Sequence, residues 1–82
     1  MQTVRVRLFA RFRDLAGTDV IELSVPHDAT VGDVRRALAS RNLGAEALLA
    51  RSRIAVNGEL AGDSRPVRIA DEIALIPPVS GG

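Results

Sequence analysis

Residues 30–41, with the sequence TVGDVRRALASR, give the clearest helix signal in the chain. Thr30 is a favourable N-cap, and Asp33 three residues later completes a variant of the capping box. The apolar residues have the spacings of three and four that place side chains on one helix face: Val31, Val34 and Leu38. We expect the arginines of this segment to point largely toward solvent: Arg35, Arg36 and Arg41. A helix with one apolar face must cover a sheet.

Segments with alternating apolar residues lie on both sides of this helix. Before it, period-two alternation predicts strands at 3–9 and 20–25, with a short helical turn at 10–16 between them. After it, a short helical or irregular stretch at 45–50 precedes the remaining predicted strands: 53–56, 59–61 and 73–76. The first two of these are joined by Asn57-Gly58, the strongest two-residue hairpin signal.

This order of elements resembles the β-grasp, or ubiquitin-like, fold of the α+β class. We therefore expect a mixed sheet of about five short strands packed on one main helix. The first strand should pair in parallel with the last at the centre of the sheet, which would carry the residues after Ile76 off the sheet. We expect the β-grasp domain to span residues 1–77 and a flexible C-terminal Gly-Gly tail to span residues 78–82.

Composition excludes several classes of function. The 82 residues are 46% apolar and 26% charged, with no apolar run long enough for a membrane span and no signal-peptide pattern, so we expect one cytoplasmic domain. The chain has no cysteine, and His27 is its one histidine, so a thiolate nucleophile, a metal site or a catalytic dyad is not expected. A net charge of +1 gives no overall field for nucleic acid.

The last six residues, PPVSGG, combine a stiff base with an unhindered end. Two prolines favour an extended stem, and five residues from Pro78 to Gly82 reach about 16 Å at ~3.3 Å per residue. Glycines lack Cβ atoms, so a narrow channel can close around them. The terminal carboxylate is a poor electrophile until ATP converts it to an acyl-adenylate, after which a sulfur donor can form a thiocarboxylate. This chemistry requires no cysteine in the chain.

Three segments carry a family resemblance. Residues 73–82, IALIPPVSGG, resemble the C-terminus of molybdopterin synthase small subunits, and the match includes the terminal residue. The opening VRVRLFA at 4–10 with RDLAG at 13–17, and the segment AVNGE at 55–59, also resemble that family. The resemblance therefore covers essentially the whole chain.

The resemblance implies a sulfur-carrier subunit with no catalytic side chains and no bound cofactor or metal. A ubiquitin-activating-like adenylyltransferase would use ATP to adenylate Gly82, a sulfur donor enzyme would load sulfur there, and Gly81 would permit threading. The tail would then enter the molybdopterin synthase large subunit, in a heterotetramer, and sulfurate cyclic pyranopterin monophosphate for molybdenum cofactor biosynthesis. The expected partner-binding residues are the tail and its base: Phe9, Leu75, Ile76, Pro77, Pro78, Val79 and Ser80. For Phe9, Leu75 and Ile76 a role in the core alone is an open alternative.

Other functions remain open on the sequence alone. Thiamine-type sulfur carriers share the fold and the Gly-Gly end, and a ubiquitin-like protein modifier would pass the same acyl-adenylate to a lysine amine. The chain has no lysine and so cannot form polymers through its own side chains. A non-carrier β-grasp binding module would instead use exposed arginines to contact RNA or phosphate: Arg5, Arg7, Arg11 and Arg13.

Overall fold

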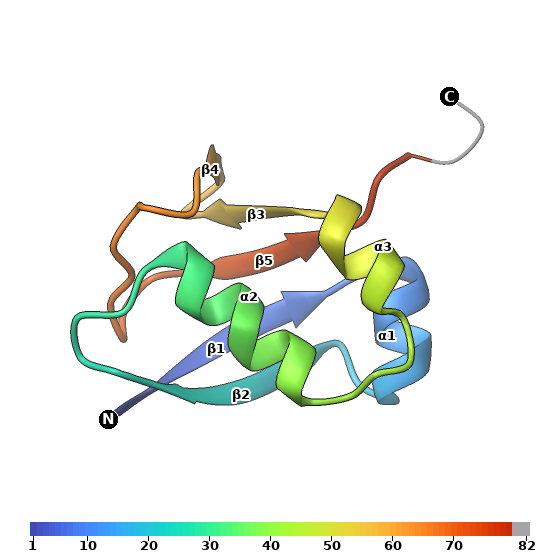
Figure 1. Ribbon diagram of the computed structural model, residues 1–82, viewed down its shortest axis with the longest axis horizontal. Coiled ribbons are helices and arrows are strands. Elements are labelled where there is room, and N and C mark those ends of the chain that lie inside the picture. Colours follow the sequence, from blue (N-terminus) through green and yellow to red (C-terminus); the bar gives the residue numbers. More distant parts are fainter. Residues whose placement is uncertain (80–82) are drawn as a thin grey trace.

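The computed structural model describes residues 1–79, which form a sheet with helices packed on it (Figure 1). The first half of the chain contains β1 (Gln2–Leu8), α1 (Ala10–Ala16), β2 (Val20–Val25) and α2 (Val31–Ser40). The second half contains α3 (Glu46–Arg51), β3 (Arg53–Val56), β4 (Glu59–Ala61) and β5 (Ile73–Ile76). Each predicted strand is present, and the uncertain stretch at 45–50 is helix α3.

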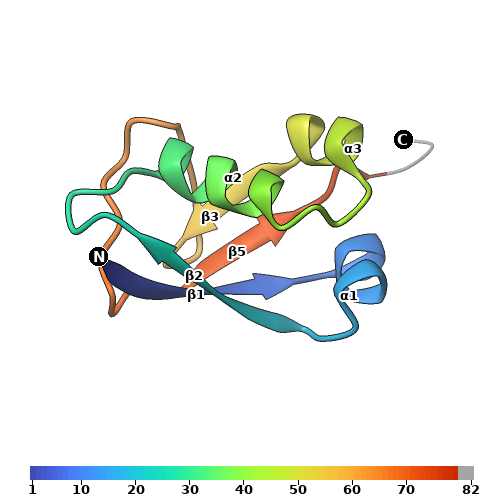
Figure 2. The ribbon, with the colours of Figure 1, turned by 60° about the horizontal axis from the view of Figure 1, so that its bottom comes forward.

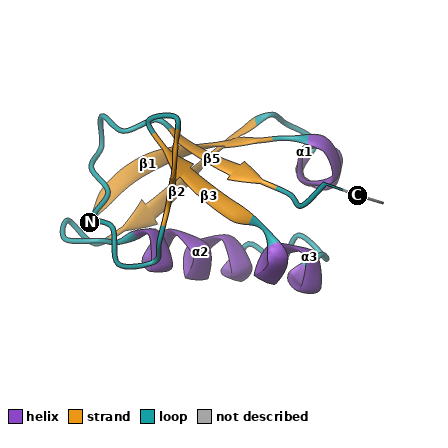
Figure 3. Cartoon of the chain, turned by 90° about the horizontal axis from the view of Figure 1, so that it is seen from above, coloured by secondary structure: helices purple, strands orange, loops and turns teal. Residues whose placement is uncertain are grey.

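The strands form a five-stranded mixed sheet in the order β2-β1-β5-β3-β4. β1 is antiparallel to β2 and parallel to β5, with Val6 opposite Ile73 and Leu8 opposite Leu75. β3 is antiparallel to both β5 and β4. Helices α2 and α3 lie along one face of this sheet (Figures 2 and 3). The predicted β-grasp arrangement, with the first and last strands paired in parallel, is therefore confirmed.

The core lies between the sheet and α2. Alternate residues of β1 face inward and are at most 1% exposed: Val4, Val6 and Leu8. The predicted apolar stripe of α2 is equally buried against them: Val31, Val34 and Leu38. Phe12 from α1 is 1% exposed and joins the same core.

The N-terminus of α2 carries the predicted capping box. The Thr30 hydroxyl accepts a hydrogen bond from the Asp33 backbone N–H at 3.4 Å, and Asp33 Oδ2 accepts from the Thr30 N–H at 2.9 Å. These reciprocal bonds satisfy backbone donors that the first helical turn leaves without partners. The backbone N–H of Thr30, which donates to Asp33, is the main cause that holds the pKa of the Asp33 carboxyl below its usual value.

Arg35 corrects one expectation about this helix. Its guanidinium does not extend into solvent but donates from Nη1 to the backbone oxygens of Leu49 at 2.9 Å and Ser52 at 3.0 Å. Arg35 Nε also lies 3.6 Å from Asp63 Oδ1. Arg35 thus donates to carbonyls at the C-terminal end of α3, where the Leu49 oxygen also accepts from the Ser52 N–H at 3.1 Å.

A polar network fixes the loop that precedes β5. The Asn57 side-chain amide donates to Asp71 Oδ1 at 3.0 Å, while Asn57 Oδ1 accepts from the Glu72 N–H at 2.9 Å. Asp71 Oδ2 accepts from the Arg68 N–H at 2.8 Å. The donated bond from Asn57 is the main cause that lowers the pKa of the Asp71 carboxyl. The network therefore joins the β3–β4 hairpin to the entrance of β5.

We expect the stabilising effect of Asp71 to disappear in acid. A carboxyl with a lowered folded-state pKa stabilises the native state above its unfolded pKa of about 3.9, and this effect is lost as pH falls through the folded value. Asp71→Asn should therefore reduce the free energy of unfolding more at about pH 6 than at about pH 2 in urea titrations. Asp14→Asn, on exposed α1, controls for the loss of one negative charge. An equal difference at both pH values would contradict the prediction.

Candidate functional site

The tail leaves from the middle of the sheet. β5 has β1 on one side and β3 on the other: Leu75 has register partners on both strands, and Ile76 is paired with Arg53 of β3. Pro77 and Pro78 then end the ladder, because proline has no N–H to donate. Val79 is 89% exposed and lies beyond the sheet, where the chain moves away from the domain (Figure 1). The sheet thus provides a rigid base for the C-terminal residues.

The predicted sulfur-bearing end lies outside the described residues. Ser80, Gly81 and Gly82 fall in this part of the chain, and their predicted roles in partner binding, threading and sulfur attachment stay predictions. The boundary expected between a domain at 1–77 and a tail at 78–82 also stays a prediction, although the last strand does end at Ile76.

Phe9 and Ile76 lie on the face of the sheet that α2 does not cover. Phe9 follows β1 and is 42% exposed, and Ile76 ends β5 and is 38% exposed. Both line one groove of about 550 Å³ on this open face. They form an apolar surface at the base of the tail, and the predicted role of Phe9, Ile76 and Val79 in partner binding stays a prediction.

Leu75 is a correction to the predicted partner-binding set. Its side chain is 0% exposed and belongs to the core. Successive residues of a strand point to opposite faces, so Leu75 and Ile76 cannot both reach the open face. Leu75 therefore acts through the position of β5 rather than by direct contact with a partner.

The open face also contains residues that sequence reasoning missed. Ala74 of β5 is the register partner of Arg7 and Ala55, and all three line the groove. Ile69, in the loop before β5, lines the same groove and is 68% exposed. The alternation of β5, which places Ala74 on the face of Ile76, could have identified this row. The position of Ile69 depends on a loop and had no such signal.

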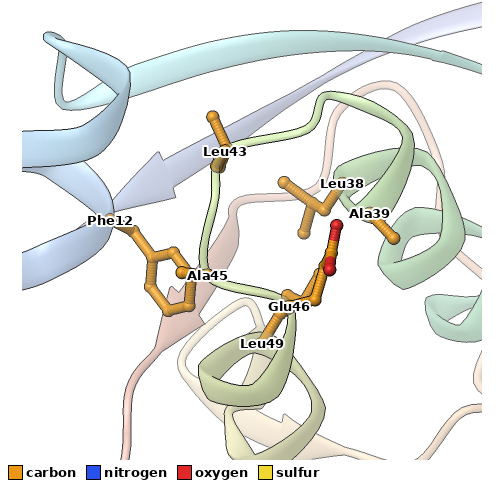
Figure 4. A pocket seen from close by; sticks show the side chains of 7 residues that line it. All are labelled: Phe12, Leu38, Ala39, Leu43, Ala45, Glu46 and Leu49. Atoms are coloured by element: carbon orange, nitrogen blue, oxygen red, sulfur yellow. The ribbon is translucent and has the colours of Figure 1, made fainter.

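A second, smaller pocket is not a ligand site. It lies where α1, the end of α2 and α3 meet (Figure 4), and its volume is about 10 Å³. That is space for no more than about one water molecule. Its lining is mostly apolar, and it includes Phe12, Leu38 and Leu49 of the core. We interpret it as a small packing gap.

The described residues contain neither a metal-ligand cluster nor a membrane-spanning helix. Among residues 1–79 there is no group of three or more His, Cys, Asp or Glu side chains that could hold a metal ion. No helix in this part of the chain has the length and apolar character needed to cross a membrane. The groove and the base of the tail are therefore the features that comparison with known proteins has to explain.

The model of the ThiS family matches residues 6–82, which include β5 and the C-terminal segment PPVSGG. The chain belongs to the ThiS family. Small archaeal modifier protein 1 of Haloferax volcanii is 38% identical, over 93% of this chain and 97% of that protein. The molybdopterin synthase sulfur carrier subunit of Arabidopsis thaliana is 35% identical, over 96% of this chain and 82% of that protein. The resemblance to molybdopterin synthase small subunits that the tail suggested is thus confirmed for this ThiS family member.

A solved complex adds a structural relative. In the complex of subunits 1 and 2 of the molybdopterin-converting factor from Helicobacter pylori, a matching chain superimposes with a TM-score of 0.69 at 27% identity. The match covers 99% of this chain and 100% of that chain. A relative of this ThiS family member therefore occurs in a complex with a second subunit.

Proposed function

We propose that this ThiS family member is the sulfur-carrier small subunit of molybdopterin synthase. The observation that carries the proposal is the exit of the PPVSGG end from the central strand of the sheet, directly beside the apolar surface of Phe9 and Ile76. A tail on a rigid base loses less conformational freedom when it enters a partner than a tail on a mobile base would. The similarity to a molybdopterin synthase sulfur carrier subunit supports the same role.

The proposed chemistry takes place on the carboxylate of Gly82. The carboxylate oxygen attacks the α-phosphate of ATP, so that pyrophosphate leaves and an acyl-adenylate forms. Hydrosulfide delivered by the donor enzyme then attacks the carbonyl carbon, a C–S bond forms, AMP leaves, and a thiocarboxylate remains. The adenylyltransferase binds the ATP, and this chain holds no cofactor of its own. The thiocarboxylate donates sulfur to cyclic pyranopterin monophosphate in the large subunit.

The open face is the proposed contact with the large subunit. The exposed apolar side chains next to the exit of the tail are Phe9, Ile76 and Val79. Pro77 and Pro78 stand between Ile76 and Val79 and favour an extended backbone there. Their burial in one interface would release water from apolar surface and align the tail with the partner's pocket. The Helicobacter pylori complex of two such subunits supports a large-subunit partner. Cytoplasmic location remains part of this proposal.

The test is intact-mass spectrometry after incubation with the activating enzyme, ATP and a sulfur donor. The chain should gain about 16 Da, because sulfur replaces one oxygen of the terminal carboxylate. A chain without Gly82 should gain nothing, since the acyl group would then belong to a different residue in a shortened tail. An unchanged mass for the complete chain, with an activating enzyme that loads another carrier, would refute sulfur transfer.

A ubiquitin-like protein modifier is the second candidate, and the similarity to small archaeal modifier protein 1 favours it. The same acyl-adenylate would then pass to a lysine amine of another protein. Affinity-tagged chain expressed in cells should in that case be recovered in covalent conjugates that are lost when Gly82 is deleted. A thiamine-type carrier would instead load sulfur normally but fail to convert cyclic pyranopterin monophosphate with any large subunit.

A further inference from the structure

Four arginines lie in the elements that meet at the end of the sheet where β5 ends and the tail begins. Because β1 and β5 run parallel, their ends meet at one edge of the sheet, and α1 follows β1 there. α3 ends and β3 begins at the same edge, since β3 is antiparallel to β5 (Figure 1). The four arginines at this edge, which we call the exit rim, are exposed: Arg11, Arg13, Arg51 and Arg53.

Arg53 is the member of the exit rim nearest to the tail by register. It is the Cα partner of Ile76, the residue directly before the two prolines. Neighbouring strands lie ~4.8 Å apart, and the six residues that follow Ile76, Pro77 to Gly82, have a maximum reach of about 20 Å. The four residues after the two prolines contain two glycines, so a tail that turns back beyond Pro78 can bring its terminal carbonyl to the side chain at position 53.

Once the C-terminal acyl group is activated, its fate depends on whether a nearby cationic side chain is a lysine or an arginine. A lysine amine that loses its proton attacks the carbonyl carbon, so that an amide forms and AMP, or a thiol in the case of a thioester, leaves. A guanidinium stays protonated and delocalised, and it carries positive charge without a free amine. All 11 basic residues of this chain are arginine. The exit rim thus has cations that do not take up the acyl group.

We propose that the arginine exit rim is a selectivity feature, which keeps the activated C-terminus from forming an amide with its own domain. The acyl group is then left for the acceptor that the partner presents. This inference rests on the proposed activation of Gly82, and it assigns the exit rim a role in that reaction. This role of the exit rim follows from its position beside the tail. An amine at the opposite end of the sheet would lie too far from the tail to react with its acyl group as readily.

The test compares two charge-conserving variants, Arg53→Lys and Arg68→Lys. Arg68 is exposed and belongs to the loop between β4 and β5. This loop enters β5 at the end of the strand opposite to the exit rim (Figure 1). Each complete chain is prepared with a thioester at Gly82 and incubated in dilute, mildly alkaline buffer. Mass spectrometry then separates the hydrolysed acid from the internal amide, which has one water less, and peptide mapping locates the new bond.

Arg53→Lys should form the internal amide about tenfold or more faster than Arg68→Lys, at a rate independent of protein concentration, because the local amine acts at a high effective concentration. The native chain should only hydrolyse. Equal amide formation in the two variants, or none in Arg53→Lys, would overturn the inference. A parallel incubation with activating enzyme and ATP measures AMP release. Its failure with the native chain would count against the proposed function, whereas the thioester comparison would still decide the role of the exit rim.

Discussion

Replacement of Leu75 by alanine is expected to reduce the free energy of unfolding by about 2–5 kcal/mol, whereas Ile76→Ala should have a much smaller effect. The Leu75 side chain is completely buried between the central strand and the helix, so its removal leaves a cavity that the surrounding core cannot fill. Ile76 is 38% exposed on the open face and has less packing to lose. Urea unfolding followed by circular dichroism measures both values.

For the affinity to the partner, we expect the larger loss with Ile76→Ala and the smaller loss with Leu75→Ala. Ile76→Ala should weaken the affinity for the large subunit by about tenfold, the size of effect typical of a residue near an interface centre. Leu75→Ala, measured at a temperature where it remains folded, should bind more nearly like the native chain. A large loss of affinity for Leu75→Ala with unchanged stability would contradict the placement of Leu75 in the core.

Gly81→Val should reduce the rate of sulfur transfer by a factor of about 100 or more. The proposed channel around the tail has room for a backbone without a Cβ atom, and a branched side chain would displace the acyl carbon from its reaction position. The domain should keep its stability, because position 81 follows the last strand and both prolines. Thiocarboxylate formation and conversion of cyclic pyranopterin monophosphate are the rates to measure.

Gly81→Ala is the matched comparison for this tail variant. It adds a single methyl group at the same position without a branch, so its rate should fall much less than that of Gly81→Val. If Gly81→Val transfers sulfur as fast as the native chain, the tip does not pass through a narrow channel. The glycine pair would then have to be explained by another property than its small size.

Local patterns predicted most of the fold because they depend on neighbouring residues. The capping box of Thr30 and Asp33 is a four-residue signal, and the Asn57-Gly58 hairpin is a two-residue signal. The inward alternation in β1 follows from the period of the strand. Each of these features can be identified without knowledge of the rest of the chain.

Contacts between distant segments could not be predicted in the same way. Arg35 occupies a helix position that points away from the apolar stripe, and only the placement of α3 brings two carbonyl oxygens to it. Leu75 is a different case, because the sequence leaves open whether it contacts a partner or lies in the core alone, and its burial places it in the core. The position of Ile69 on the groove required the path of a loop.

The central place of β5 has a consequence for synthesis of the protein. β5 lies between β1 and β3 and is the last strand to be synthesised. While the chain is still growing, β1 and β3 therefore lack the strand that pairs with both of them. Sheets closed by contacts this distant in sequence fold late and as a unit. A chain that stops before β5 would therefore have neither a stable domain nor a tail, and only a finished molecule would present its C-terminus to the activating enzyme on a folded surface.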